Sequence, residues 1–279
     1  MPIFQAGESI AAVLRGQRVP LPQLEVRMLL EHVVRLTRVQ MITQAERPLS
    51  ADEARQFDTL CARRIAGEPM AYLLGEREFY GLALQVDPNV LIPRPETELL
   101  VELALQHLPP NGRVLDMGTG SGAIAVAIAH ARPDAQVSAL DASMPALQVA
   151  QANAARHGVR VRFVHSDWFA AIDGERFDLI VSNPPYIVAG DRHLSEGDLR
   201  FEPIDALTDH ADGLSALRTI STGAAAHLIP DGWLLMEHGY DQAQPVRALL
   251  DAAGLGKVQS WRDLAGIERA SGGQITAPV

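Results

Sequence analysis

An acceptor-rich corner is the first chemical feature of the sequence. Asn183-Pro184-Pro185-Tyr186 follows the apolar run FDLIVS. Two consecutive prolines remove two backbone N–H donors, fix φ at about −65°, and push Asn183 toward an extended conformation. Such a corner suits a ligand that carries N–H donors. The alternative interpretation is a merely stiff exit from a strand.

A glycine-rich turn, Gly118-Thr119-Gly120-Ser121-Gly122, stands between an apolar run and an apolar helical pattern. Glycines allow a tight turn and close approach of a ligand at a helix N-terminus, although such a turn alone is weak evidence for any one nucleotide. The spacing is not the dinucleotide fingerprint G-x-G-x-x-G. Asp116 precedes the first glycine, so the site would repel a pyrophosphate and attract a cationic amino group.

Two further strand ends carry polar or aromatic side chains. Asp141 ends the pattern QVSALD, where a carboxylate can bind both hydroxyls of a ribose. Ser166-Asp167-Trp168 offers an acceptor for an exocyclic amine and a surface for an adenine ring. Singly, each acid could be a helix N-cap and Trp168 a core residue. Together they predict a site for a nucleoside that carries an amino acid, which is S-adenosylmethionine.

These side chains need elements whose ends converge. From Pro95 onward, helical and strand patterns alternate: helix 95–108, strand 113–118, helix 121–131, strand 136–141, helix 144–158, and strands 161–167 and 177–182. This alternation predicts a doubly wound, mostly parallel α/β sheet with helices on both faces. Ligands of such sheets bind at the carboxyl ends of the strands.

The first part of the chain shows helical patterns only, including LPQLEVRMLLEHVVRL and a capping box that begins at Ser50. We therefore expect a small N-terminal helical bundle domain over residues 1–75. A hairpin linker over 76–93, with a turn at Asp87-Pro88-Asn89, should lead into the α/β domain over 94–279.

With Asn183 after the fourth strand, the sequence resembles the class I, Rossmann-like methyltransferases that carry Asn-Pro-Pro-Tyr and methylate a planar amide or nucleobase nitrogen. We predict that the Asn183 side-chain oxygen and the Pro184 carbonyl accept the two N–H bonds of the substrate NH2, while Tyr186 covers the planar group. The catalytic residues are then Asn183, Pro184, Pro185 and Tyr186. The cofactor-binding residues are Gly118, Thr119, Gly120, Ser121, Gly122, Asp141, Asp167, Trp168 and Asn183.

Three segments narrow the resemblance: GEREFYG from Gly75, LIPRPETE from Leu91, and FEPIDAL from Phe201. They are similar to signature segments of the peptide chain release factor glutamine methyltransferases, the PrmC or HemK family, over nearly the whole chain. The resemblance implies methylation of the glutamine in the Gly-Gly-Gln loop of bacterial class 1 release factors, that is, release factors 1 and 2. S-adenosylmethionine would be the methyl donor and S-adenosylhomocysteine the product. We expect the N-terminal domain and the polar stretch 187–213 to grip the release factor, and residues 91–98 to form part of the site wall.

Three alternatives remain. A sister group that methylates a ribosomal protein has a segment resembling Pro-Arg-Ser-Pro where this chain has Pro-Arg-Pro-Glu-Thr-Glu. An amino methyltransferase of adenine or guanine would use Asn-Pro-Pro-Tyr in the same way. However, 24 Lys and Arg against 34 Asp and Glu give a net charge of −10, which disfavours binding of a nucleic-acid substrate. The third is a non-catalytic nucleotide-binding protein of the same fold.

The remaining features indicate no membrane or metal. The single cysteine, Cys61, excludes an internal disulfide and fits the reducing cytoplasm, and we interpret it as a small buried side chain. No signal-peptide pattern is present, the longest apolar run, 123–129, is too short to span a membrane, and the histidines show no metal-ligand spacing. Near the C-terminus, Gly272-Gly273-Gln274 repeats the proposed substrate motif, and we interpret it as coincidental turn material rather than a self-methylation site.

Overall fold

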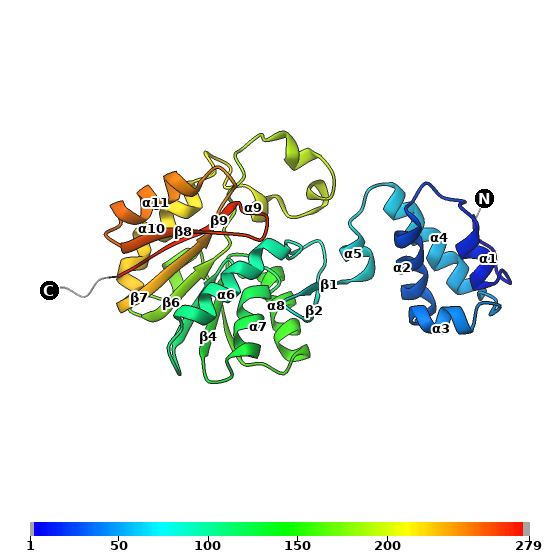
Figure 1. The fold of residues 1–279 in the computed structure, drawn as a ribbon, viewed down its shortest axis with the longest axis horizontal. Coiled ribbons are helices and arrows are strands. Elements are labelled where there is room, and N and C mark those ends of the chain that lie inside the picture. The colour runs from blue at the N-terminus through cyan, green and yellow to red at the C-terminus, as the bar shows by residue number, and fades with distance from the viewer. Residues whose placement is uncertain (1–2, 276–279) are drawn as a thin grey trace. The chain divides into compact units, whose positions relative to one another are not determined.

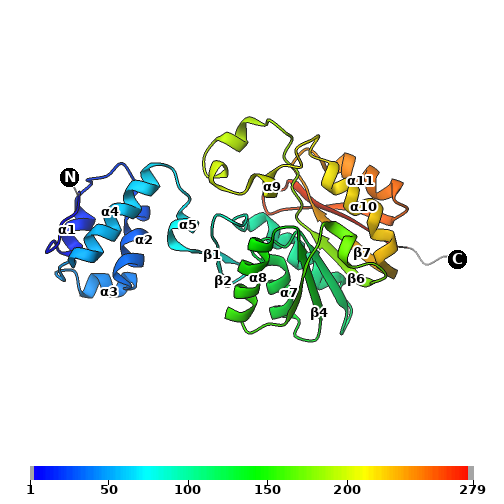
Figure 2. The ribbon, with the colours of Figure 1, turned by 180° about the vertical axis from the view of Figure 1, so that it is seen from behind.

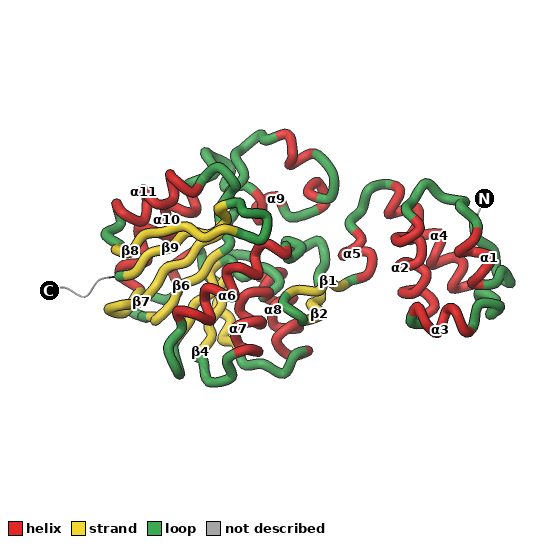
Figure 3. Tube along the Cα trace, in the orientation of Figure 1, coloured by secondary structure: helices red, strands yellow, loops and turns green. Residues whose placement is uncertain are grey.

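The structure is a computed structural model that describes residues 3–275, and the chain divides into two compact units, Met1–Gly75 and Glu76–Val279. Figure 3 shows helices and loops in the first unit, while the strands all belong to the second. None of the helices described is long and apolar enough to cross a membrane.

The first unit consists of helices α1 (Ile10–Arg15), α2 (Gln23–Val34), α3 (Arg38–Thr43), α4 (Ala51–Ile65) and α5 (Met70–Leu74). The capping box at Ser50 begins α4, as the sequence indicates, because Ser50 and Glu53 satisfy each other's backbone N–H groups. Apolar side chains of α1, α2 and α4 form one core together with Phe4. Cys61 lies in this core, and burial raises the pKa of its thiol to about 12.

The second unit begins with an antiparallel hairpin of β1 (Glu76–Phe79) and β2 (Leu82–Gln85). The turn predicted for this hairpin, Asp87-Pro88-Asn89, was wrong. The chain reverses at Tyr80 and Gly81, whose φ angles are +51° and +76°, the pair of positive values that a two-residue hairpin turn favours. Tyrosine rarely adopts a positive φ, so Tyr80 did not indicate a turn in the sequence. Asp87-Pro88-Asn89 instead turns the chain after β2.

Residues 76–93 were predicted to be a linker, but they pack as part of the second unit. Phe79, Leu82 and Leu84 belong to the core cluster of the α/β sheet. The buried Asn153 on α8 (Met144–Arg156) accepts from the Gln85 N–H at 2.6 Å and donates to the Gln85 carbonyl at 3.0 Å. Its amide also donates to Ser121 O, so the hairpin is tied to the glycine-rich turn.

The sheet has seven strands in the order β5-β4-β3-β6-β7-β9-β8. These are β3 (Arg113–Met117), β4 (Gln136–Asp141), β5 (Val161–His165), β6 (Phe177–Ser182), β7 (Leu228–Glu237), β8 (Gly256–Arg262) and β9 (Glu268–Gln274). Strands β3 to β7 pair in parallel, and β9 runs antiparallel to both of its neighbours. The predicted doubly wound, mostly parallel α/β fold is therefore confirmed.

Helices cover both faces of the sheet (Figures 1 and 2). Helices α6 (Glu98–His107), α7 (Ala123–Ala131) and α8 pack on one face, while α10 (Ser215–His227) and α11 (Ala243–Ala252) pack on the other. Side chains of successive strand residues point to opposite faces of the sheet. Val114 packs in the core on the α6–α8 face, and Leu115 packs in the core on the α10–α11 face. Burial on both faces explains why these strands are almost continuously apolar.

The Gly272-Gly273-Gln274 motif lies in strand β9, so its interpretation as turn material was wrong. A Cβ on Gly272 would approach the Leu234 carbonyl oxygen to 2.4 Å, which explains why glycine is needed where β9 packs against β7. Gln274 is 9% exposed, and its side-chain Nε2 donates to Asp231 O at 2.8 Å. Packing therefore accounts for this motif.

The predicted polar stretch 187–213 contains only short helices: the 3-10 turns η3 (Arg192–Ser195) and η4 (Leu199–Phe201), and α9 (Ile204–Leu207). Figure 1 shows it as the yellow-green loop between β6 and α10. Its base is closed by bonds from Ile187 N to Leu207 O at 3.0 Å and from Ala189 N to Ala211 O at 3.0 Å. The stretch is therefore a closed loop rather than an extended connection.

Candidate active site

The carboxyl ends of β3, β4, β5 and β6 open into one cavity of about 420 Å³. Nine of the residues predicted from the sequence line it: Gly118, Thr119, Gly120, Ser121, Asp141, Asp167, Trp168, Asn183 and Pro185. They come from four strand ends that adjoin in the sheet, which is the place where doubly wound sheets bind ligands. The parallel register thus brings together residues that are far apart in sequence.

The glycine-rich turn uses its glycines in two ways. Gly118 and Gly120 have φ of +70° and +54°, and a Cβ at either position would meet no heavy atom within 4 Å. Both line the cavity, so an added side chain would enter it. Gly122 does not line the cavity, and a Cβ there would lie 3.0 Å from Ala150 Cβ on α8. Gly122 therefore allows α7 and α8 to pack closely.

Most N–H groups of the turn are already engaged. Those of Gly118 and Thr119 donate to Leu140 O, at 2.9 and 3.0 Å, and that of Gly120 donates to Asp141 Oδ2 at 2.9 Å. These donors fix the turn against β4 and are taken before a ligand arrives. The turn therefore differs from a phosphate loop, whose N–H groups point at the anion.

Asp116, at the end of β3, is almost fully buried at 1% exposure. Its Oδ2 accepts from Thr119 Oγ1 at 2.6 Å and from Ala125 N at 3.2 Å, whereas its buried Oδ1 has no partner among the residues described. Burial raises the pKa of Asp116 to about 7. An unpartnered carboxylate oxygen is costly to bury, which points to a donor that arrives with the ligand.

Asp141 and Trp168 occupy the next two strand ends. Asp141 accepts one backbone bond on each oxygen, from Gly120 N and from Ser143 N, and burial raises its pKa. Ser166 donates to Trp168 O at 2.7 Å and accepts from Ala171 N at 3.0 Å, which stabilises the tight turn in which Trp168 adopts a φ of +45°. Hydrogen bonds therefore fix the Asp141 carboxylate and the backbone of Trp168.

Asn183 is joined to a buried glutamate through a threonine. Asn183 Nδ2 donates to Thr97 Oγ1 at 3.1 Å, and Thr97 Oγ1 donates to Glu237 Oε2 at 2.7 Å. Thr97 ends the 3-10 turn η1 (Pro95–Thr97), and Glu237 is the last residue of β7. Both are buried, and burial raises the pKa of Glu237 to about 7.

Two predicted catalytic residues, Pro184 and Tyr186, are not part of the cavity lining. Pro184 is buried at the end of β6. The Tyr186 hydroxyl donates to Glu237 Oε1 at 3.1 Å, and its half-buried ring packs against the core on the α10 side of the sheet. Burial, with the Glu237 carboxylate next in importance, raises the pKa of this phenol.

The two signature segments 91–98 and 201–207 meet beside Asn183. Glu202, whose side chain is fully buried, accepts from Ile92 N at 2.9 Å and forms an ion pair with Arg94. Residues of both segments line the cavity, namely Leu91, Pro93, Arg94, Thr97, Pro203, Asp205 and Ala206. The expected site wall at 91–98 therefore exists, and the loop 187–213 completes it.

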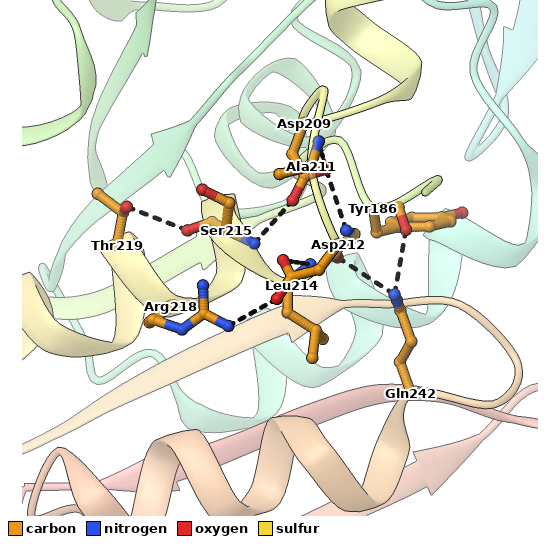
Figure 4. A network of polar contacts seen from close by, with 10 residues as sticks. Tyr186, Asp209, Ala211, Asp212, Leu214, Ser215, Arg218, Thr219 and Gln242 are labelled. Atoms are coloured by element: carbon orange, nitrogen blue, oxygen red, sulfur yellow. Dashed lines mark hydrogen bonds and ion pairs between the residues drawn. The ribbon is translucent and has the colours of Figure 1, made fainter. Parts of the chain in front are cut away.

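A glutamine fixes the chain where it leaves the Asn-Pro-Pro-Tyr corner (Figure 4). Gln242 Nε2 donates to the carbonyl oxygens of Tyr186 and Gly213, each at 3.1 Å, and its Oε1 accepts from Gly239 N at 2.8 Å. A Cβ on Gly213 would lie 2.6 Å from Tyr186 O, so only glycine permits this approach. Asp209 accepts from three further N–H groups at the end of the loop.

Thr97, Glu237 and Gln242 were not predicted as site residues. Thr97 stands in the segment that resembles the family, and no strand was predicted after β6. A charged residue directly after the apolar run WLLM is the signal that could have found Glu237. Among residues 3–275 no three potential metal ligands are grouped together.

This fold and cavity define a class I methyltransferase. A family model described as a methyltransferase small domain matches residues 95–196. A solved methyltransferase from Pyrococcus furiosus aligns with a TM-score of 0.55 at 18% identity, covering 77% of this chain and 98% of its own, which supports the shared fold.

The chain belongs to the release factor glutamine methyltransferase family. A release factor glutamine methyltransferase of Burkholderia pseudomallei is 57% identical over 274 residues, 95% of either chain. One of Neisseria gonorrhoeae is 54% identical, covering 91% of this chain and 94% of its own. A model of the PrmC N-terminal domain matches residues 5–75. The resemblance inferred from the sequence segments is thereby confirmed, and the chain is a methyltransferase enzyme.

Proposed function

We propose that the protein transfers the methyl group of S-adenosylmethionine to the side-chain amide nitrogen of the glutamine in the Gly-Gly-Gln loop of bacterial release factors 1 and 2. The observation that carries the proposal is the common cavity: Asn183 and Pro185 line the same cavity as the glycine-rich turn and Asp141. The names of the related proteins support the choice of acceptor.

The chemistry of one side of the cavity fits S-adenosylmethionine. Asp116 does not itself line the cavity, but it stands two residues before Gly118, which does, and its unpartnered Oδ1 suits the cationic amino group. The open space beside Gly118 and Gly120 suits the amino-acid chain of the cofactor, and Asp141 suits the ribose. Asp167 and Trp168 are assigned to the adenine. When bound, this cofactor supplies an electrophilic methyl group on a sulfonium centre.

The acceptor side must position a weak nucleophile, because the lone pair of an amide nitrogen is delocalised into its carbonyl. We assign the Asn183 side-chain oxygen and the Pro184 carbonyl to accept the two N–H bonds of the glutamine NH2. Both acceptors stand on a corner that Pro184 and Pro185 make rigid, so little entropy is lost on binding. Acceptors aimed at a nitrogen that becomes more positive stabilise the transition state.

The structure changes the role proposed for two residues. Gly122 is assigned to helix packing rather than to direct cofactor contact, because its missing Cβ faces Ala150. Tyr186 is assigned to the support of Glu237, because its hydroxyl donates to that carboxylate. The remaining predicted site residues keep their assignments as proposals.

We further propose that the N-terminal unit and the loop 187–213 dock the release factor, and that the enzyme acts in the cytoplasm, where a single reduced cysteine is stable. Deleting residues 1–75 should impair methylation of intact release factor more than binding of S-adenosylmethionine. Equal loss of both would contradict a docking role.

The decisive experiment measures transfer of labelled methyl from S-adenosylmethionine to purified release factor. Label should appear on the wild-type factor and not on a factor with Gln→Ala in its Gly-Gly-Gln loop. A ribosomal protein mixture, DNA and RNA serve as rival acceptors. Label on any rival alone would overturn the proposal.

A further inference from the structure

We infer that Thr97 and Glu237 are positioning residues that fix which end of the Asn183 amide faces the methyl acceptor. The inference rests on the proposed function, since it explains how Asn183 presents an oxygen rather than an NH2 group to the substrate. It concerns a chain of hydrogen bonds that runs from Glu237 through Thr97 to Asn183. Neither Thr97 nor Glu237 needs to touch the reacting atoms.

An asparagine amide can be turned by 180° with little change in shape, so its orientation depends on its partners. With Nδ2 toward Thr97, Asn183 offers Oδ1 to the cavity and can accept an N–H bond. In the opposite orientation it would offer two donors to a substrate that also presents donors. The wrong orientation therefore removes the acceptor and creates a clash of donors.

Ionised Glu237 selects the productive orientation. A carboxylate accepts hydrogen bonds only, so the Thr97 hydroxyl must donate its one proton to Glu237, where the distance is 2.7 Å. The Thr97 oxygen can then only accept from Asn183, and Nδ2 is the donor available at 3.1 Å. Each of the two hydrogen bonds, from Asn183 to Thr97 and from Thr97 to Glu237, thus has only one possible donor.

Tyr186 completes the selection from the other side. Its hydroxyl donates to Glu237 Oε1, so both oxygens of the carboxylate are occupied by donors. Tyr186 directly follows the second proline of the corner that carries Asn183. Asn183, through Thr97, and Tyr186, directly, are therefore bonded to the same glutamate, Glu237. The corner is therefore held to β7 at two points.

Protonation of Glu237 removes the selection. A protonated carboxyl can donate to Thr97 Oγ1, which frees the threonine proton to point at Asn183 and permits the reversed amide. The charged groups that face Glu237 are Arg269 on β9 and Glu96 on η1, with the Tyr186 phenol after β6. Burial outweighs the hydrogen bonds from Thr97 and Tyr186 and the attraction of Arg269, and it raises the pKa of Glu237 to about 7.

The first test compares threonine variants at saturating cofactor and release factor. Thr97→Val keeps the shape but removes the hydroxyl, and kcat should fall at least 30-fold while cofactor affinity changes less than threefold. Thr97→Ser restores the hydroxyl and should recover most of kcat. Thr219→Val is the matched control, because within residues 3–275 the Thr219 hydroxyl bonds only to Ser215 O in its own helix. Equal kcat for Thr97→Val and wild type would overturn the inference.

The second test follows pH. In the wild type, kcat should decrease as pH falls from 8 to 6, because Glu237 takes up a proton. In Glu237→Gln, kcat should be lower at pH 8, by roughly threefold to tenfold, and should no longer vary over this range. An acid limb that is unchanged in Glu237→Gln would count against the inference.

A third measurement does not require a methyl acceptor. The side-chain ¹⁵N and ¹H signals of Asn183, assigned by their loss in Asn183→Ala, should shift between pH 6 and 8 in the wild type and stay constant in Thr97→Val. Identical behaviour in both proteins would refute the coupling. If wild-type protein methylates no glutamine, the proposed function fails, while this measurement still decides the inference.

Discussion

The side of the cavity proposed to bind the cofactor and the side proposed to bind the methyl acceptor, called here the cofactor side and the acceptor side, are built in different ways. The cofactor side uses residues that end or directly follow β3, β4 and β5, so each is placed by its own strand. The acceptor side combines segments near residues 94–97, 183–186, 202–206 and 237, which are joined by side-chain hydrogen bonds.

The two sides each contain a buried carboxyl group whose pKa is about 7, but their oxygens differ. Asp116 keeps one buried oxygen without a partner among the described residues, whereas both oxygens of Glu237 accept bonds from the protein. The first carboxyl is incomplete without a ligand, and the second is complete. Substitutions should therefore separate cofactor affinity from catalytic rate.

The largest expected effect lies on the acceptor side. Asn183→Ala should lower kcat about 1,000-fold, equivalent to about 4 kcal/mol, because the substrate NH2 loses an acceptor. Asn183→Asp keeps an oxygen for the substrate but loses the Nδ2 donor to Thr97, so its kcat should fall as well, though less than that of Asn183→Ala. Steady-state methylation assays measure kcat, and calorimetric titration measures cofactor affinity. A greater loss in Asn183→Asp would show that the oxygen is not the essential part.

The next effect lies on the cofactor side. Asp116→Asn should weaken S-adenosylmethionine binding about 100-fold, equivalent to about 2.7 kcal/mol, because the cationic amino group loses its carboxylate. At saturating cofactor, kcat should fall much less. Asp134→Asn is the control, since Asp134 pairs with Arg132 outside the cavity. Unchanged cofactor affinity in Asp116→Asn would remove Asp116 from the site.

Gly120 and Gly122 belong to the same turn but have different roles, because Gly120 lines the cavity and Gly122 permits close helix packing. Gly120→Ala should weaken cofactor binding about 10-fold, because its Cβ enters the cavity, and should cost about 1 kcal/mol of stability from its positive φ. Gly122→Ala should cost more stability, about 2 kcal/mol or more, because its Cβ also presses on Ala150. Calorimetric binding and urea unfolding distinguish the two, and the reverse pattern would contradict these roles.

The smallest effect concerns stability and pH. The pKa of Asp116 is about 7 in the folded protein, above its unfolded value of about 4, so the folded state holds more protons between these values. This group therefore makes the protein less stable as pH rises from about 4 to 7. In Asp116→Asn the melting temperature should fall less over this range, by roughly 3 °C or more. Parallel melting curves for both proteins would argue against a buried, titrating Asp116.

The strand ends that line the cavity at Gly118 and Asp141 could be predicted from the sequence because their signals are local. An apolar strand followed by glycines or ending in an acid indicates both the element and its place at the ligand-binding edge of the sheet. The acceptor side was predicted only at Asn183-Pro184-Pro185-Tyr186, whose prolines are visible in isolation. Thr97, Glu237 and Gln242 have ordinary residue types, and nothing in their neighbouring residues indicates their partners.

Two predictions from the sequence were wrong for the same reason, namely that contacts between residues distant in sequence are not visible in local patterns. Gly272-Gly273-Gln274 reads as a turn because paired glycines favour turns, yet close packing against Leu234 places it within β9. Residues 76–93 read as a linker because they lie between two patterns, yet Asn153 binds Gln85 and ties them to the sheet. In each case a contact distant in sequence decided the outcome.

By itself the sequence determined the alternation of strands and helices, the glycine-rich turn and the acceptor-rich corner, since backbone preference and hydrophobic period act over a few residues. The tertiary structure alone decided that Asn183 meets Thr97 and that Thr97 meets Glu237, across 86 and 140 positions of sequence separation. Hydrogen bonds depend on distance and direction in space. The parallel register of β6 and β7 brings Asn183 and Glu237 to the same edge of the sheet, where Thr97 of η1 joins them.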